Sequence, residues 1–302
     1  MSSGERLKST EKKSPDLRVI TNKQGPYLLL LPAFLVLLGV TVYPLFYSIY
    51  LSITDHSGKF IGFQNYITIF SDLDFILSWG RTFLFSLVAI IAETLLGLIL
   101  AMLLNQKHVH FKTFLQTAFI IPMMIAPIAV GVTFKIMYHP LIGIINYFLS
   151  WFGVLPIDWL GNNFSAFVAI LILEIWRGTP FMFLLIYAGL QGIPYDMYEA
   201  ADLDGARPFR AFLDITVKWL KPTLLLAIAL RVLDMFTAFD EIMGSTAGGP
   251  GNATEMVSIY IYKTSFRFQL FNTGAAMSIV FLIITIFLAI QILRHSFRRE
   301  GE

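Results

Sequence analysis

Two pairs of oppositely charged residues interrupt long apolar runs of this sequence. Glu174 and Arg177 form one pair, and Arg231 and Asp234 form the other. Both pairs are spaced i,i+3, so in a helix the two members lie on one face and can neutralise each other. A charge that faces lipid is costly, so these side chains should face protein or water. They could line a polar path through a membrane, or they could be ion pairs that only hold helices together.

The composition predicts an integral membrane protein. Of 302 residues, 56% are hydrophobic and 14% are charged, whereas a soluble domain has roughly 25% charged residues. The net charge of +2 is too small to indicate a nucleic-acid partner. Cysteine is absent, which excludes disulfides, thiolate metal sites and cysteine nucleophiles.

Few residues are suited to catalysis or metal binding. The five histidines are scattered over loops and ends, and the closest pair, His108 and His110, is spaced i,i+2 and does not share a helical face. We therefore expect no metal site. The sequence has no Walker A motif and no Gly-x-Ser-x-Gly elbow. We expect a chain that is not an enzyme and binds no cofactor, so any energy would be supplied by another chain.

Six apolar runs are long enough to cross a bilayer, which takes about 20 helical residues. This predicts an all-α integral membrane protein with six transmembrane helices. The first run is too long for the core of a cleavable signal peptide, and Pro32 and Pro44 should bend it. The runs are 27–51, 82–104, 113–137, 165–189, 222–242 and 274–293.

The basic residues predict that both termini are cytoplasmic. With six spans, fifteen Lys and Arg fall on the side of the termini, and four fall on the other side, namely Lys59, Arg81, Lys263 and Arg267. The positive-inside rule then places segments 105–112 and 190–221 in the cytoplasm. The expected organisation is a tail over 1–26, a first span with an external segment over 27–81, a core domain over 82–293 and a second tail over 294–302.

The longest polar interruption predicts a cytoplasmic docking surface. Pro194 suits a first helical turn and Gly205 suits a left-handed helix end, so roughly 195–204 should form a short helix. Ala200 and Ala201 would let another surface approach the backbone closely, within a charged rim formed by Glu199, Asp202 and Asp204. The alternative is an ordinary surface helix in a loop.

The same stretch carries a family resemblance. Residues 199–206, Glu-Ala-Ala-Asp-Leu-Asp-Gly-Ala, followed by Phe212, Ile215 and Pro222, resemble the cytoplasmic EAA loop of bacterial ATP-binding-cassette (ABC) importer permeases. Segments 174–181 and 248–255, with Tyr260-Ile261-Tyr262, resemble the first permease subunit of the carbohydrate-uptake branch, of the maltose or glycerol-phosphate type. Tyr43-Pro44, residues 62–66 and Asp158-Trp159-Leu160 also resemble this family. The resemblance therefore covers nearly the whole chain after the N-terminal tail.

The resemblance implies a type I ABC importer permease fold in the bacterial inner membrane, with an EAA coupling helix within about 195–220. The implied partners are a second permease subunit in a heterodimer, two copies of a cytoplasmic ATPase that bind ATP and Mg, and an external solute-binding protein. The substrate would be a sugar or a sugar-like solute.

The resemblance also implies roles for particular residues. Those expected to couple to the ATPase are Glu199, Ala200, Ala201, Asp204 and Gly205. Those expected along the substrate path are Glu174, Arg177, Arg231 and Asp234. Those expected to receive the binding protein are Gly249, Pro250 and Asn252.

One position departs from the family pattern. Val217-Lys218 stands where the family has a Leu-Pro pair, so the backbone keeps an N–H there and the bend into the next span should be gentler. Two other classes of protein remain alternatives: a secondary transporter or channel that works without ATP, and a membrane scaffold without a pore. Secondary transporters often contain internal repeats, and the two halves of this chain show no clear repeat.

Overall fold

A computed structural model describes residues 25–106 and 108–297, and in these ranges the chain is helical except for loops and one isolated β-bridge between Thr54 and Phe60. The described residues up to Tyr50 form one compact unit, and those from Leu51 onward form a second. Most of the predicted tail over 1–26 lies outside the described residues, as does the end of the tail over 294–302.

The first unit is one apolar helix with a wider turn in its middle. α1 (Gly25–Leu37) continues through a π-helical segment (Leu38–Val42) into α2 (Tyr43–Ser52). The π-helical segment stands next to Pro44, which has no N–H to donate, and such a wider turn is one way for a helix to accommodate the missing bond. Residues 29–52 are long and apolar enough to cross a membrane.

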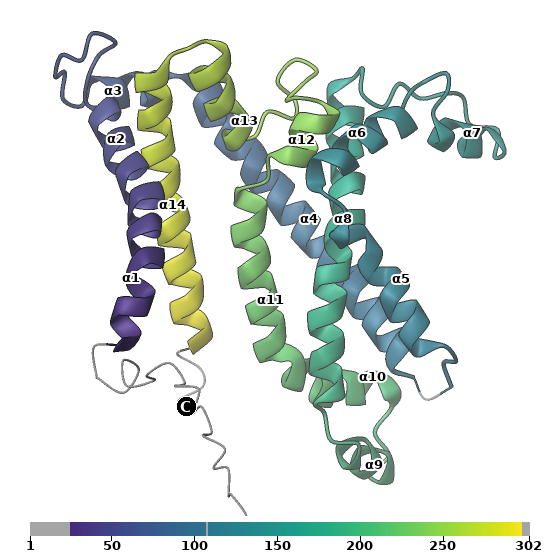
Figure 1. Cartoon of the computed structure of the whole chain (residues 1–302). Helices are drawn as coiled ribbons and strands as arrows, with labels where there is room; N and C mark the ends of the chain where they lie inside the picture. Colours follow the sequence, from purple (N-terminus) through teal and green to yellow (C-terminus); the bar gives the residue numbers. More distant parts are fainter. Residues whose placement is uncertain (1–24, 107, 298–302) are drawn as a thin grey trace, which may run out of the picture. The chain divides into compact units, whose positions relative to one another are not determined.

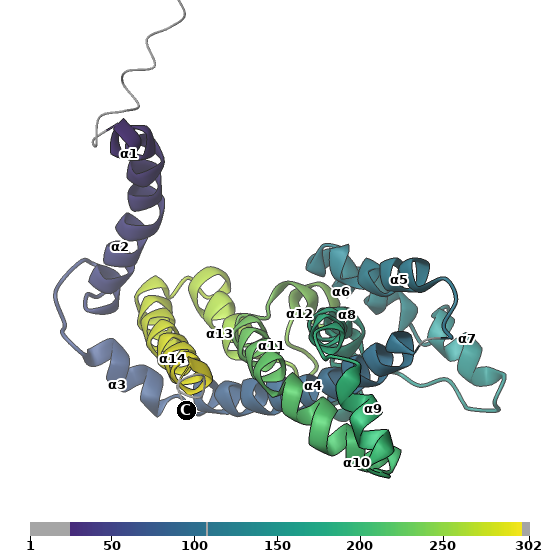
Figure 2. The same ribbon diagram turned by 90° about the horizontal axis from the view of Figure 1, so that it is seen from below.

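The second unit is built around four helices, drawn in Figures 1 and 2. They are α4 (Leu73–Asn105), α8 (Asn163–Gln191), α11 (Lys218–Phe236) and α14 (Phe271–Phe297), and α4 crosses the other three. The starts of α4 and α8 are capped by side chains, because Asp72 accepts hydrogen bonds from the N–H groups of Asp74 and Phe75, and Asn162 accepts one from Phe164. Such caps satisfy N–H groups that have no partner within the helix.

Close contact between α4 and α8 depends on a glycine. A Cβ placed on Gly97 would lie 2.9 Å from the Cβ of Met182 and 2.9 Å from the backbone N of Phe183. The absent side chain therefore lets the two backbones approach, as small residues commonly do between membrane helices. Buried apolar side chains fill the space beside this contact, among them Leu104, Phe183, Ile186 and Leu220.

The predicted span 113–137 is not one straight helix. α5 (Lys112–Met124) and α6 (Pro127–Met137) meet at an angle of 93°. The break has a sequence cause, because the residue before a proline is driven out of the helical region, and Ala126 before Pro127 has φ −56° and ψ 129°. This apolar run therefore forms a bent pair of helices and not one continuous helix.

Among the described residues, four helices are long and apolar enough to cross a membrane. The number of candidate spans is five if the bent α5–α6 pair is one span. The four are 29–52, 73–105, 163–191 and 271–292. α11 occupies most of the predicted span 222–242 but carries Lys218, Lys221, Arg231 and Asp234, so length and composition alone do not identify it as a span. The count of six therefore stays a prediction.

Short helices connect these long ones. Three of them lie within or next to the segments 52–80 and 243–273. They are α3 (Gln64–Ser71), α12 (Asp240–Ser245) and α13 (Val257–Tyr262). α13 continues into a π-helical segment (Lys263–Arg267). α7 (Ile144–Ser150) lies in the segment that follows α6. At the opposite end, α9 (Asp196–Leu203) and α10 (Pro208–Ala211) join α8 to α11 (Figure 1).

We expect Gly97→Ala to lower the stability of the protein by about 1–3 kcal/mol, because the added methyl group would meet a backbone atom that cannot move aside. Gly80→Ala is the matched control in the same helix, since a Cβ at Gly80 meets nothing within 4 Å. The control should be neutral or stabilising, by up to about 1 kcal/mol. Thermal unfolding of the purified membrane complex measures both changes, and equal melting temperatures for the two variants would contradict the close-contact explanation.

Candidate functional site

Arg231 is the centre of a buried ion network that joins three long helices. From α11 it reaches Glu93 of α4, with its Nε 2.6 Å from Oε2 and its Nη2 2.9 Å from Oε1 of that carboxylate. The same Nη2 donates to Oε1 of Glu174 on α8. The side chains of Glu93 and Glu174 are fully buried, and that of Arg231 is 3% exposed. The bidentate contact with Glu93 uses the fork geometry that guanidinium groups offer to carboxylates.

Arg177 extends the network towards the end of α11 and to α12. Its Nη2 lies 2.9 Å from Oε1 of Glu174 and 3.5 Å from Oε1 of Glu241 on α12. Asp234 contacts both arginines, since it accepts a hydrogen bond from Nη1 of Arg231, and its Oδ2 is 3.8 Å from Nη2 of Arg177. Four carboxylates and two guanidinium groups thus meet inside the helix bundle.

Some polar atoms of the network have no hydrogen-bond partner in the described protein. These buried atoms are Oε2 of Glu174, Oε1 of Glu241 and Nε of Arg177. Buried polar groups are normally paired, so unpaired atoms in a native structure often mark a functional position. Because Glu174 and Glu241 also interact with each other, the atom of the network that stays without a partner is Nε of Arg177, which is buried.

Gly178 makes room for the network. A Cβ on this residue would collide with Nη2 of Arg231 and with the carboxylate of Glu93. The backbone of α8 therefore lies directly against the ion pair that links α4 to α11. A larger residue at position 178 would displace the pair.

The sequence identified part of this network. Both predicted i,i+3 pairs, Glu174 with Arg177 and Arg231 with Asp234, are confirmed as ion pairs. The sequence did not indicate that Arg231 binds Glu93 and Glu174, because these contacts join residues far apart in the chain. Glu241 was also missed, although a carboxylate within an apolar run was a signal that could have identified it.

A small pocket, which we call the polar pocket because its lining includes three charged side chains, opens beside the network. It has a volume of about 360 Å³ and is lined by Met123, Arg177, Gly178, Phe181, Leu230, Arg231 and Asp234. Asp234 stands out among the ionised groups because its side chain is 56% exposed, whereas the two arginines are 15% and 3% exposed. The charge that this pocket presents most openly is therefore negative.

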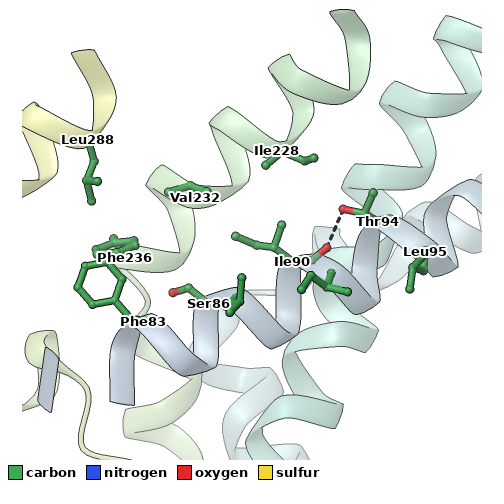
Figure 3. A pocket seen from close by; sticks show the side chains of 11 residues that line it. Phe83, Ser86, Ile90, Thr94, Leu95, Ile228, Val232, Phe236 and Leu288 are labelled. Carbon is green, nitrogen blue, oxygen red and sulfur yellow. Dashed lines mark hydrogen bonds between the residues drawn. The ribbon is translucent and has the colours of Figure 1, made fainter. Parts of the chain in front are cut away.

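A second pocket, shown in Figure 3, is apolar and differs in character. It lies between α4 and α11, with Leu288 of α14 at one side, and its volume is about 450 Å³. The hydroxyl of Thr94 donates to the carbonyl of Ile90, 2.6 Å away, and the hydroxyl of Ser86 is buried without a partner. Nearly all of its surface is hydrocarbon, which does not suit a solute rich in hydroxyl groups.

α9 confirms the predicted short helix and protrudes beyond the ends of α8 and α11 (Figure 1). Pro194 precedes this helix, which begins at Asp196, so the expectation that it lies in the first turn was wrong. The chain turns at Gly205, whose φ is +73°, a conformation that glycine adopts without strain. The N–H of Ala206 donates to the carbonyl of Ala201, 2.9 Å away, as at many helix ends.

α9 is joined to the base of α11 by a hydrogen bond between side chains. The hydroxyl groups of Tyr198 and Thr216 are 2.8 Å apart. Thr216 belongs to a π-helical segment (Phe212–Val217) that continues directly from α10 into α11. The N–H of Lys218 donates to the carbonyl of Ile215, which a proline at position 218 could not do.

Charged side chains support this π-helical segment from outside. Oδ1 of Asp214 is 3.0 Å from Nζ of Lys218, and Oδ2 is 3.5 Å from Nε of Arg210. The hydrogen bond from Lys218 and the charges of both basic groups lower the pKa of Asp214 below its ordinary value. The carboxylate is thus ionised at neutral pH, although ion pairs this exposed contribute little to stability.

The turn-rich segment after α12 contains the residues expected to receive a binding protein. Gly249 and Pro250 are joined by a cis peptide bond, and Asn252 has φ +65°. Thr254 donates to the carbonyl of Gly249, 2.7 Å away, and the carboxylate of Glu255 is 3.0 Å from Nζ of Lys263. Within the ranges 25–106 and 108–297, no group of three or more His, Asp or Glu side chains is arranged to hold a metal ion.

Comparison with known proteins defines the class. Residues 93–300 match the family described as the inner membrane component of binding-protein-dependent transport systems. The chain belongs to this family and is a permease component of an ABC transporter.

Its relatives include sugar permeases. The chain is 37% identical to the trehalose/maltose transport system permease protein MalF of Thermococcus litoralis over 280 residues, which cover 91% of this chain and 94% of that one. It is 35% identical to the sulfoquinovosyl glycerol transport system permease protein SmoG of Agrobacterium fabrum over 259 residues, which cover 84% of each chain. Its fold is similar to that of a chain of a bacterial ABC transporter involved in the import of the acidic polysaccharide alginate. The TM-score is 0.79 and the sequence identity is 21%, and the match covers 90% of this chain and 95% of the other.

We expect Arg231→Met to destabilise the protein by about 3–5 kcal/mol, because it leaves the buried carboxylate of Glu93 without a partner and removes one partner of Glu174. Adding Glu93→Gln should restore part of this loss, since it removes the uncompensated charge. The melting temperatures of the single and double variants measure the effect. If the double variant is less stable than Arg231→Met alone, Glu93 and Arg231 do not stabilise the fold as a pair.

Proposed function

We propose that this chain is one of two permease subunits in an ATP-driven importer of a sugar or sugar-like solute. The second permease, two copies of a cytoplasmic ATPase that bind ATP and Mg, and an external solute-binding protein would complete the complex. The support is the family membership and the relatives, whose names include trehalose/maltose and sulfoquinovosyl glycerol permeases. A solved relative in fold is in complex with a periplasmic protein that holds an alginate pentasaccharide.

The observation that carries this proposal is the physical link from α9 to the buried ion network. α9 would dock to the ATPase through Glu199, Ala200, Ala201, Asp204 and Gly205. The Tyr198–Thr216 hydrogen bond joins α9 to the start of α11, and α11 carries Arg231, which is paired with α4 and α8. Arg231 lies fifteen positions after Thr216, which corresponds to about 22 Å along a helix. A displacement of α9 would therefore reach the ion network through one continuous helix.

In the proposed mechanism, ATP binding closes the ATPase pair and moves α9, and α11 transmits the movement into the bilayer. The polar pocket lined by Arg177, Arg231 and Asp234, with Glu174 behind it, would be part of the substrate path. Gly249, Pro250 and Asn252 would contact the binding protein on the outer side. The distribution of basic residues supports this orientation, with both termini in the cytoplasm.

We expect Ala200→Trp and Gly205→Val to abolish most ATP-dependent uptake in vesicles that contain the whole importer. The first fills the small face of α9, and the second forces a branched side chain into a left-handed conformation. Gly62→Val is a matched control, because Gly62 also has positive φ and open space around it but lies on the predicted outer side. Uptake and ATP hydrolysis are measured together. Normal uptake by both α9 variants, or uptake driven by an ion gradient without ATP, would contradict the proposal.

We expect Tyr198→Phe and Thr216→Val to reduce uptake per ATP hydrolysed while the ATPase stays bound, because each removes the hydrogen bond without altering the exposed face of α9. If the bond transmits movement, the double variant should be no worse than either single variant. Thr117→Val serves as a control, since the hydroxyl of Thr117 only bonds within its own helix. Additive losses in the double variant would show that the two residues act separately.

A further inference from the structure

The charge of the transported sugar is left open by the family. One relative carries trehalose or maltose by name, and a relative in fold imports an acidic polysaccharide. The polar pocket beside the ion network offers a physical criterion, because the sign of the charge that it exposes must suit the solute. This inference rests on the proposed function, in which that pocket belongs to the substrate path.

We propose that the pocket beside Asp234 admits sugar rings that carry no negative charge, either neutral or cationic, and disfavours anionic sugars. Asp234 acts as the residue that determines this specificity.

The exposed charged group of the pocket is a carboxylate. The side chain of Asp234 is 56% exposed, although it lies near the end of a helix that we place in the membrane. The hydrogen bond from Arg231 goes to Oδ2, so Oδ1 can accept a hydrogen bond from a ligand hydroxyl or ammonium group. An exposed carboxylate in such a position is costly against lipid and should face water or a polar ligand.

The two guanidinium groups are mostly covered, and that of Arg231 is fully engaged. Arg231 uses Nε, Nη1 and Nη2 for carboxylates and is 3% exposed. Arg177 is 15% exposed; its Nη2 pairs with Glu174 and Glu241, and its Nε is buried without a partner. A carboxylate or sulfonate on a sugar would have to displace the partners of Arg231 or reach the covered guanidinium of Arg177, and in both cases it would approach the like charge of Asp234. Juxtaposed like charges are a common means of rejecting a wrong ligand.

Apolar side chains complete the pocket. Met123 and Leu230 are partly exposed, and Phe181 lies in the lining. The C–H faces of a sugar ring can pack against such walls while its hydroxyl groups bond to a carboxylate. The apolar pocket of Figure 3 has no charged group in its lining, so it supplies no comparable discrimination.

The test measures binding of three disaccharides of similar size to the membrane complex of both permeases and the ATPases in nanodiscs, without the binding protein. The probes are maltose, which is neutral, the glucosamine disaccharide, which is cationic, and digalacturonate, which is anionic. Calorimetric titration should show that the wild-type complex binds digalacturonate at least about tenfold more weakly than maltose. Asp234→Asn should reduce this difference in affinity between maltose and digalacturonate, and Asp234→Glu should leave the difference unchanged. Asp74→Asn, which removes an exposed carboxylate outside the pocket, should leave all three affinities unchanged.

Several results would overturn the inference. The first is equal affinity of the wild type for maltose and digalacturonate. The second is an unchanged ratio of these two affinities in Asp234→Asn, and the third is no binding of any probe. Weaker association of the two permeases in Asp234→Asn, with unchanged selectivity, would show that the partner subunit covers this carboxylate. The same wild-type and variant complexes are also reconstituted with the binding protein into sealed vesicles, where ATP-driven uptake by the complete importer is recorded. Its persistence would show that only the specificity inference had failed, whereas its loss in the wild type would reject the proposed function.

Discussion

The second unit of the chain depends on the neutralisation of Arg231. A guanidinium group taken out of water is tolerated only when carboxylates in good geometry surround it. Glu93 supplies two contacts and Glu174 and Asp234 supply further ones, so the requirement is met by residues from α4, α8 and α11 together. Because no single helix can satisfy it, this charge fixes the mutual placement of all three.

Glycines allow the helices to approach closely enough for that network. Gly97 brings the backbones of α4 and α8 together, and Gly178 leaves the space that Arg231 and Glu93 occupy. Interior packing is dense and tolerates added volume poorly, so such contacts make a group of helices move as a unit. A rigid unit suits a transporter in which movement begins at a cytoplasmic loop and must reach a distant path. The hydrogen bond between Tyr198 and Thr216 connects α9 to α11, so it would transmit that movement to the edge of the rigid group of helices.

Local features of the sequence predicted local features of the fold. The i,i+3 charge pairs, the short helix before Gly205 and most of the long apolar helices follow from spacing within one segment. The 93° break between α5 and α6 could also have been inferred from Pro122 and Pro127, had the apolar run not been taken as continuous. Contacts such as Glu93 with Arg231 join residues 138 positions apart, and periodicity within a segment carries no information about them. Glu241 could have been noticed as a carboxylate within an apolar run, but its pairing with Arg177 of α8 joins residues far apart in the chain.

The position that departs from the family pattern shows how a local change can be absorbed. Without a proline at 218, the N–H of Lys218 bonds to Ile215, and the helix runs from α10 through the π-helical segment into α11. A π-helical turn is wider and less regular than the α-helix around it, so it is a position where a helix can shift in register. Here it lies between Tyr198 of α9 and the buried network of α11, with Ile215 and Thr216 buried. The continuous backbone transmits movement along the helix. The π-helical turn allows a shift in helical register, which the rigid ion network further along α11 does not allow.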